Sequence, residues 1–129
     1  MSAKFPIYRD ANTLLLQIEQ AVRTFPRYHK YTIGSELRRA TMELVRQLSR
    51  SIKYADQRLR WVTEAHDTLD DLKVQIQLAK ELKAFHSFRQ YESIAALAFG
   101  VSKQAWGWKK KLQRTSSEKG MRGLNGVQS

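Results

Sequence analysis

The sequence predicts an all-α fold, arranged as an up-down-up-down antiparallel four-helix bundle. Apolar residues recur at steps of three and four along four long segments, which is the spacing of one buried helix face. No segment alternates polar and apolar residues as a half-buried strand would, and proline is confined to positions 6 and 26. A chain of 129 residues is long enough for one core and too short for two. We therefore expect a single bundle domain over residues 1–113.

The first two helices are expected to form a hairpin around a proline. The first begins near residue 7 and ends at Phe25, because Pro26 cannot continue a helix. An aromatic and cationic turn follows over residues 25–31, and Thr32 is the expected N-cap of the second helix. The predicted core residues are Ala11, Leu14, Leu15, Ile18, Val22 and Phe25 in the first helix, and Ile33, Leu37, Ala40, Leu44, Leu48 and Ile52 in the second.

The third helix is expected from about Asp56 to Phe85, and a fourth follows it. The segment Ser87-Phe88-Arg89-Gln90 matches a capping box, in which a hydroxyl and an amide side chain each satisfy a free backbone amide. The inner stripes are Leu59, Val62, His66, Leu69, Leu72, Ile76, Ala79 and Leu82, then Tyr91, Ile94, Ala98, Val101, Ala105, Trp108 and Leu112. Residues 114–129 contain three glycines, several serines and no aromatic residue, which predicts a disordered basic tail.

The composition limits the class of protein. The chain has no cysteine, so disulfides and cysteine-based zinc sites are excluded. No window approaches the roughly 20 apolar residues that span a bilayer. The first residues also lack the apolar stretch of a secretory signal. We therefore expect a cytoplasmic protein with no membrane partner.

Cations exceed anions by a wide margin, with 23 Lys and Arg against 12 Asp and Glu. A small helical core does not need this excess, and self-repulsion works against it. The excess is uneven, since residues 58–85 hold five of each sign whereas residues 86–129 hold eight cations and two anions. A polyanion is the natural partner, because fixed cations release counterions from a phosphate backbone without reading its sequence.

The first candidate phosphate-binding surface lies on the second helix and the turn before it. Arg38, Arg46 and Arg50 are expected to share much of one solvent face with Lys53, close to the first turn. Arginine favours this interpretation because its forked guanidinium suits phosphate geometry, and the alternative is a solvated face that keeps the protein soluble. The full candidate set is Arg23, Arg27, His29, Lys30, Arg38, Arg39, Arg46, Arg50 and Lys53.

The second candidate surface lies on the fourth helix. Phe99, Lys103, Trp106 and Lys110 fall at steps of four, three and four on a stripe outside the predicted seam, beside the basic cluster Lys109-Lys110-Lys111. Aromatic rings between cations can stack bases while following a strand. The alternative is that Phe99 and Trp106 pack against another subunit. Two large rings outside one core indicate an interface in either case.

Enzyme chemistry finds little support. The three histidines are far apart in sequence, and there is no Gly-rich phosphate loop, nucleophile elbow or Cys-His pair. Asp67, Asp70 and Asp71 lie along one side of the third helix. We interpret them as a solvated face or as partners of arginines on another subunit, rather than as a metal site. We therefore expect no catalytic residue, no metal and no cofactor.

Several segments together resemble a known superfamily of four-helix bundles. They are Phe25-Pro26-Arg27-Tyr28-His29-Lys30-Tyr31-Thr32-Ile33-Gly34, Leu37-Arg38-Arg39-Ala40, Leu69-Asp70-Asp71-Leu72-Lys73-Val74-Gln75-Ile76-Gln77-Leu78-Ala79-Lys80-Glu81-Leu82 and Gln90-Tyr91-Glu92. The superfamily includes the 23S rRNA intervening-sequence proteins and the accessory variability determinant proteins of diversity-generating retroelements, and the likeness spans about residues 7–112.

Two segments favour the retroelement branch. Intervening-sequence proteins carry Asn-Ile-Ala-Glu-Gly near the end of helix two, where this chain has Leu48-Ser49-Arg50-Ser51-Ile52-Lys53-Tyr54. Trp106-Gly107-Trp108-Lys109 is similar to the Gly-Trp-rich close of the accessory proteins' last helix, although Ala105-Trp106 stands where a glycine pair is common.

The resemblance implies a bacterial or phage-encoded, ring-shaped homopentamer with a basic surface. Such a protein binds the element's reverse transcriptase and its RNA, and supports error-prone cDNA synthesis without being the polymerase. The acidic edge of the third helix meeting arginines of an adjacent subunit is our own inference. The alternatives are an intervening-sequence-type protein with an RNA-binding role, and a protein scaffold whose charge serves only solubility.

Overall fold

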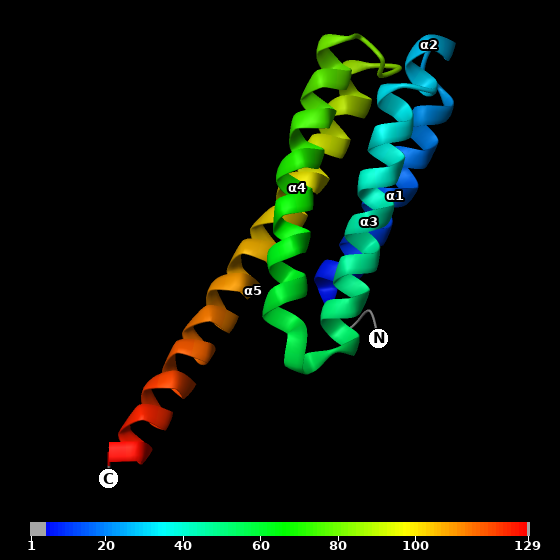
Figure 1. Ribbon diagram of the computed structural model, residues 1–129. Coiled ribbons are helices and arrows are strands. Elements are labelled where there is room, and N and C mark those ends of the chain that lie inside the picture. Colours follow the sequence, from blue (N-terminus) through cyan, green and yellow to red (C-terminus); the bar gives the residue numbers. More distant parts are fainter. Residues whose placement is uncertain (1–4, 129) are drawn as a thin grey trace.

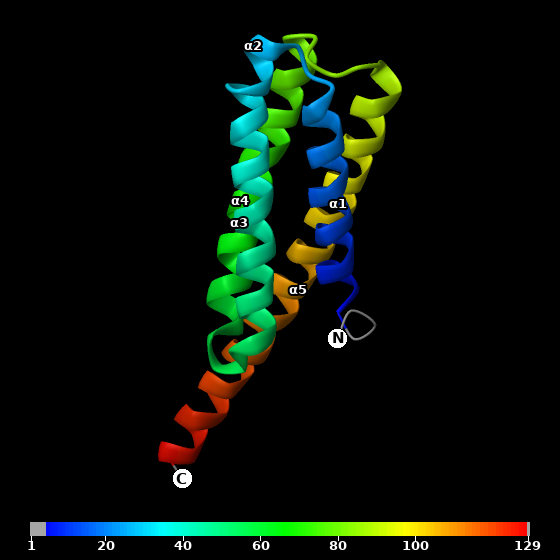
Figure 2. The ribbon, with the colours of Figure 1, turned by 90° about the vertical axis from the view of Figure 1, so that its right-hand side faces the viewer.

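Four long helices pack side by side with alternating direction (Figures 1 and 2). The computed structural model describes the backbone of residues 5–128 and the side chains of residues 5–118. The helices are α1 (Pro6–Arg23), α3 (Ile33–Lys53), α4 (Arg58–Glu81) and α5 (Phe88–Gln128), with a short α2 (Arg27–Lys30) and a 3-10 turn (Ala55–Gln57) in the connections. Each long helix contacts two neighbours, in the cyclic order α1, α3, α4, α5. This arrangement is consistent with the predicted four-helix bundle. Within residues 5–128, no helix is both long enough and apolar enough to cross a membrane.

The core is built mostly from the stripes that the periodicity predicts. Leu15, Ile52, Leu59 and Leu112 are half-buried and lie outside the core, and α4 gives two further exceptions. His66 is half-buried and Leu82 is 41% exposed, so neither belongs to the core. Leu82 is exposed because α4 ends at Glu81, and Lys83 then turns the chain with a positive φ of 58°. Phe85 turns inward instead, with its ring edge-to-face against Phe25 at 5.3 Å between centroids. The large side chains that are almost fully enclosed include Leu14, Ile18, Leu37, Leu44, Leu48, Val62, Leu69, Leu72, Ile94 and Val101.

The predicted capping box begins α5, and the predicted N-cap residue of α3 is in place but makes no capping hydrogen bond with its side chain. The Gln90 amide donates to Ser87 Oγ at 3.1 Å, and Gln90 Oε1 accepts from the His86 amide at 2.9 Å. Thr32 stands at the N-cap of α3 but its side chain does not cap the helix. Its hydroxyl donates to the Tyr28 carbonyl at 2.9 Å instead, because α2 ends just before it and leaves that carbonyl within reach.

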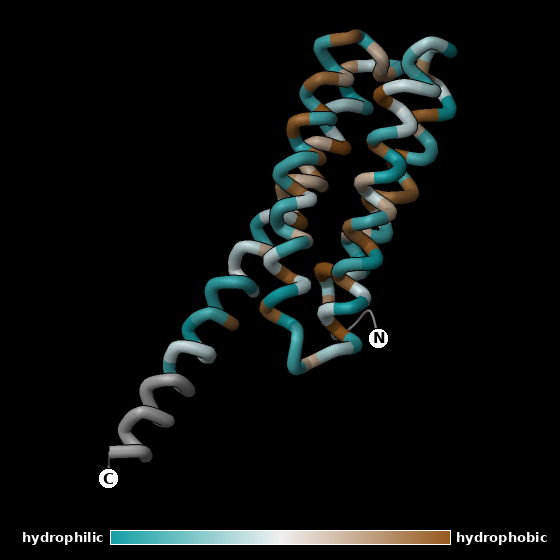
Figure 3. The backbone as a smooth tube through the Cα atoms, viewed as in Figure 1, coloured by the Kyte–Doolittle hydropathy of each residue, from teal (hydrophilic) through white to brown (hydrophobic). Residues whose placement is uncertain are grey.

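Helix α5 continues through residues 114–128, where the sequence predicts a disordered tail. Leu112 is the last half-buried side chain, and residues 113–118 are all exposed, so the bundle ends near the predicted domain boundary. Figures 1 and 2 show the rest of α5 projecting past the bundle, and the part of it that is coloured in Figure 3 is mostly hydrophilic. No proline follows Pro26, and a helix already nucleated in the bundle gains one hydrogen bond for each residue added. The tail is therefore a helical extension in the structure.

Arg58 connects all four long helices at the end of the bundle from which α5 projects. Its Nε donates to the Ser51 carbonyl at 2.8 Å and its Nη2 to the Ile52 carbonyl at 3.2 Å, so the guanidinium satisfies free carbonyls at the end of α3. The guanidinium carbon also lies 5.8 Å from the ring centroids of both Phe5 and Trp108. One side chain at the start of α4 therefore links the end of α3, the entry to α1 and the exit of α5.

Replacing Gly34 with alanine is expected to lower the free energy of unfolding by about 1–3 kcal/mol, because overpacking costs more than the gain in helix propensity. An added Cβ would lie 2.9 Å from Val22 Cγ1 and 3.1 Å from the His29 carbonyl oxygen. Gly100→Ala is the matched control, since its Cβ meets nothing within 4 Å and should stabilise the helix by about 0.5–1 kcal/mol. Urea unfolding followed by circular dichroism measures both changes. Equal effects of the two substitutions would contradict the close approach at Gly34.

Arg58→Ala is expected to lower the free energy of unfolding by about 2–3 kcal/mol, because two carbonyls lose a charged donor and two rings lose their stacking partner. Arg60→Ala is the control. This substitution removes an exposed arginine from the same turn. The Arg60 guanidinium lies over the Trp61 ring and 4.0 Å from Glu64, so its loss should lower the free energy of unfolding by less than about 1 kcal/mol. The same urea titration reports both values, and a cost for Arg58→Ala no larger than for Arg60→Ala would show that the four-helix link is not stabilising.

Candidate nucleic-acid interface

The arginines of α3 lie on two different sides of the helix. Arg39, Arg46, Arg50 and Lys53 follow one outer stripe, at spacings of seven, four and three residues. Arg38 does not share this stripe as predicted, because eight residues separate it from Arg46 and place it roughly 80° around the helix. It faces α1 instead, where its Nε donates to Glu19 Oε1 at 2.7 Å.

Carboxylates and a ring already engage most of the outer stripe of α3. Arg39 Nη1 lies 3.1 Å from Glu36 Oε1, and Arg46 Nη2 lies 2.6 Å from Glu43 Oε2. The guanidinium of Arg50 lies over the Trp61 ring of α4, 5.0 Å from its centroid. Exposed pairs of this kind are weak and can be exchanged for phosphate, but each glutamate lowers the local positive potential. The α3 surface is therefore less basic than its arginine content suggests.

The first turn and the far end of α3 do not form one patch. The first turn carries three cations, with Arg23 at the end of α1, Arg27 at the start of α2 and Lys30 at its end. Arg39 lies near this turn, because it lines a shallow hollow together with Tyr28 and His29. Lys53 is at the opposite end of α3, roughly 20 Å away at the rise of an α-helix. The predicted surface is thus divided between the two ends of the bundle.

The aromatic and cationic stripe predicted on the fourth helix is present on α5. Phe99 is 58% exposed and Trp106 is 54% exposed. The ammonium of Lys103 lies 5.7 Å from the Phe99 centroid, and that of Lys110 lies 5.6 Å from the Trp106 centroid. A hollow beside Trp106 is lined by Gly107, Lys110 and Arg114 among others. The geometry is as the spacing predicts, and its role in binding stays a prediction.

The cations of α5 differ from those of α3 in their partners. Over residues 88–118, α5 carries the acids Glu92 and Glu118, and none of its cations forms a salt bridge with a carboxylate that the structure describes. These cations are Arg89, Lys103, Lys109, Lys110, Lys111 and Arg114. Within the described side chains, the surplus charge is therefore less compensated on α5 than on α3, and Arg23, Arg27 and Lys30 around the first turn likewise form no salt bridge.

The lysines over the rings favour a polyanion over a dry subunit contact at Phe99 and Trp106. Packing either ring against an apolar surface would also remove its lysine ammonium from water, which is costly without a counterion. A nucleic acid can offer a base to the ring and a phosphate to the lysine. The pairing of ring and cation is therefore better suited to nucleic acid than to subunit packing.

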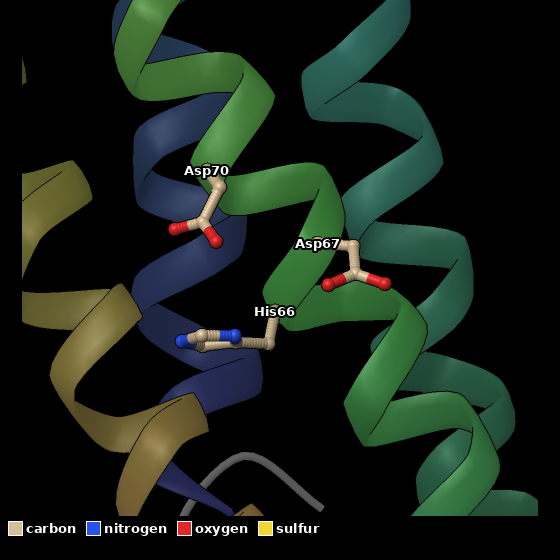
Figure 4. Close-up of side chains that lie close together, drawn as sticks. All are labelled: His66, Asp67 and Asp70. Atoms are coloured by element: carbon tan, nitrogen blue, oxygen red, sulfur yellow. The ribbon is translucent and has the colours of Figure 1, made fainter.

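The acidic edge of α4 includes one small cluster, shown in Figure 4. Ligand atoms of His66, Asp67 and Asp70 lie within 4.8 Å of one another. His66 and Asp70 are on the side of α4 nearer α5, whereas Asp67 points toward α3 (Figure 4). Asp70 Oδ1 lies 3.2 Å from Lys73 Nζ, so one of the three carboxyl and imidazole groups is already paired.

The three predicted acidic residues thus have different surroundings. The Lys73 ammonium that pairs with Asp70 also donates to Ser102 Oγ of α5 at 3.2 Å, so Asp70 supports a contact between helices. Asp67 and Asp71 are exposed and leave an acidic edge on the outer face of α4. Exposure of this edge fits both interpretations, a solvated face and a contact with arginines of another subunit, and both stay predictions.

Sequence reasoning missed a third pair of ring and lysine at the start of α5. Lys80 Nζ of α4 lies 6.0 Å from the Phe88 centroid and 5.1 Å from the Tyr91 centroid. Phe88 is 63% exposed and borders a hollow with Lys80 and Lys83. The available signal is spacing, since Phe88 precedes Phe99 by eleven residues, which is about three turns and returns to the same face.

Comparison with known proteins gives one family. A family model described as bAvd-like matches residues 7–112. The matched range includes all four helices of the bundle and ends where the last half-buried side chain of α5 lies. No curated protein matches the chain.

Charge reversal on α5 is expected to weaken nucleic-acid binding more than the same reversal on α3. The α5 variant combines Lys103→Glu, Lys110→Glu and Arg114→Glu, and the matched α3 variant combines Arg39→Glu, Arg46→Glu and Lys53→Glu. Fluorescence anisotropy with a labelled RNA across a salt series should show a lower affinity for the α5 variant than for the α3 variant. The salt slope should fall by about 0.7 for each single-strand phosphate that α5 no longer neutralises. A weaker affinity in the α3 variant than in the α5 variant would assign the interface to the arginine stripe instead.

Proposed function

The chain belongs to the bAvd-like family, the accessory variability determinant proteins of diversity-generating retroelements, and we propose that it is a nucleic-acid-binding partner of a retroelement reverse transcriptase. It binds the enzyme and the template RNA together and supports the error-prone cDNA synthesis that diversifies a target gene. Membership of an accessory, non-catalytic family is the observation that carries this proposal. It also favours the retroelement branch over the intervening-sequence branch.

The contribution of such a protein is positional. Holding an enzyme and a long template in one fixed arrangement raises their effective concentration, and no bond chemistry by the accessory protein is required. A rigid set of helices suits this task because its surfaces keep their relative positions. The net charge of +11 supports the RNA part of the proposal, since phosphate contacts position a strand without reading its sequence.

The RNA is proposed to lie on α5 rather than on α3. The α5 cations have no described carboxylate partner, whereas Arg38, Arg39 and Arg46 each have one. A phosphate approaching Arg38, Arg39 or Arg46 must displace a glutamate, whereas a phosphate approaching the described cations of α5 displaces only counterions. The α3 arginines remain available as secondary contacts because exposed ion pairs are weak.

We also propose that the chain assembles into a ring-shaped homopentamer, with subunit contacts on α2 and the end of α4. Four exposed apolar side chains, Tyr28, Tyr31, Leu78 and Leu82, gather around one hollow there. Apolar groups gathered at one place are more typical of a protein contact than of free surface. The acidic edge lies on the same helix, and Asp67 and Asp71 are proposed to meet arginines of the neighbouring subunit.

The experiment for this function reconstitutes the chain with the reverse transcriptase of its own element and the template RNA. We expect the three to elute as one complex in size-exclusion chromatography, and cDNA yield to rise several-fold over that of the enzyme alone. The α5 variant with Lys103→Glu, Lys110→Glu and Arg114→Glu should still bind the enzyme but should bind less RNA.

Native mass spectrometry of the same preparation measures the assembly, which is expected to hold five copies of the 15.0 kDa chain. Unchanged cDNA yield together with separate elution of the chain and the enzyme would contradict the accessory role. It would favour a scaffold whose charge serves only solubility.

A further inference from the structure

Three exposed aromatic rings lie along α5, and each has a lysine ammonium over it. Phe88, Phe99 and Trp106 are 63%, 58% and 54% exposed. The ammonium groups of Lys80, Lys103 and Lys110 lie 6.0, 5.7 and 5.6 Å from the respective ring centroids. A ring of α5 is therefore paired with a lysine three times, with the lysine coming from α4 at Phe88 and from α5 at the other two rings.

The three rings share one face of α5. Eleven residues separate Phe88 from Phe99 and seven separate Phe99 from Trp106, which are about three and two turns of an α-helix. At the helical rise the rings span roughly 27 Å in total. A single linear ligand lying along the helix can therefore reach all of them.

Hollows accompany the rings. Tyr91 lines both the hollow beside Phe88 and the hollow beside Phe99, so these two adjoin along the contact between α4 and α5. Lys80 and Lys83 line the first, and Lys73 lines the second. The α4 side of this face thus adds cations to those of α5, and Figure 1 shows the two helices, which contact each other, running alongside each other there.

The acids near this face are few. Glu92 lies on the same side of α5 between Phe88 and Phe99, and Asp70 is paired with Lys73 at 3.2 Å. Glu81 accepts a hydrogen bond from Gln77 Nε2 at 3.0 Å. The cations of this face therefore outnumber its unengaged carboxylates.

We propose that this face binds single-stranded nucleic acid, with unpaired bases stacked on Phe88, Phe99 and Trp106 and phosphates on the neighbouring lysines. We name it the aromatic track, and define it by these three rings with Lys80, Lys103 and Lys110. The inference rests on the proposed function and deepens it by naming the strand state of the ligand. Base stacking on protein rings is tolerant of sequence, because every base has a π-face.

The strand state follows from what the rings can reach. In a duplex the bases stack on one another, so an exposed ring on a helix surface meets only backbone and groove edges. In a single strand a base can take the ring face while the lysine that covers the ring moves to a phosphate, so the cation exchanges one favourable contact for another. At 3.4 Å per nucleotide the track matches about 8 nucleotides.

The test compares one single-stranded RNA of 12 nucleotides without self-complementarity with a 12-base-pair duplex, both labelled, by fluorescence anisotropy at low salt. The variant Phe88→Leu, Phe99→Leu, Trp106→Leu keeps apolar bulk and every charge. We expect its single-strand affinity to fall by about tenfold or more, since each stacked base contributes a factor of several to a hundred. Its duplex affinity should stay within about threefold, because phosphate contacts dominate there.

Two control variants separate ring stacking from other effects. Tyr54→Leu removes a ring that is 42% exposed and has the Lys53 ammonium 5.4 Å from its centroid but lies off both the track and the proposed subunit contact, and should leave both affinities unchanged. The aromatic variant Phe88→Tyr, Phe99→Tyr, Trp106→Phe should keep single-strand binding near that of the natural sequence. A 4-nucleotide RNA is too short to reach all three rings, and the difference between natural and leucine chains should shrink for it.

The outcomes distinguish this inference from the proposed function. Unchanged single-strand affinity in the leucine variant, or an equal loss for strand and duplex, would overturn the track while leaving nucleic-acid binding in place. A changed native mass of the leucine variant would identify the stripe as a subunit contact and would also overturn it. Failure of the natural chain to bind either RNA at low salt would remove the proposed function itself.

Discussion

The arrangement of the molecule depends on the burial of one narrow stripe of α5 between α1 and α4. Ile94, Ala98, Val101 and Ala105 are at most 2% exposed, and the two alanines allow the neighbouring backbones to approach closely. Burying this stripe fixes the rotation of α5 about its own axis, which turns Phe99 and Trp106 outward. The contact is reinforced at its margins by Gln104, which donates to Asp10 of α1 at 2.8 Å, and by the Lys73 hydrogen bond to Ser102.

The positions of the charged side chains say more about the partner than the net charge does. On α3 the arginines alternate with glutamates three residues away, so the helix is lined with short-range pairs that contribute little to stability in water. On α5 the lysines face aromatic rings instead of carboxylates, and this arrangement leaves their charge available to an external anion. Folding alone gives no reason for such an arrangement, because it adds self-repulsion without core packing. The uncompensated helix is therefore the better guide to the partner.

Sequence periodicity predicts those features that one helix decides by itself. The capping box at Ser87 and Gln90, the buried stripes and the ring spacing on α5 are all local patterns of this kind. The side of α3 on which Arg38 lies, and its pairing with Glu19, depend on where α1 packs, which spacing alone does not specify. Leu82 continues the apolar period of α4, but α4 ends at Glu81 and the Leu82 side chain is exposed rather than part of the core. Likewise Lys80 belongs to α4 and meets Phe88 only through the packing register of two helices. The spacing from Phe99 therefore indicates the third ring, but its pairing with a lysine has no signature in either segment alone.

The repetition of the aromatic track in the proposed ring bears on how weak, sequence-independent contacts can hold a long RNA. One track on one subunit offers three rings, and the energy of stacking a few bases is modest. In the proposed ring, each subunit carries its own copy of α5, and a strand already bound to one copy meets the next at a high effective concentration. Avidity then rises steeply with subunit number while each contact stays weak enough to release. A template that must advance through a polymerase requires that combination, because a single tight site would hold the strand in one register.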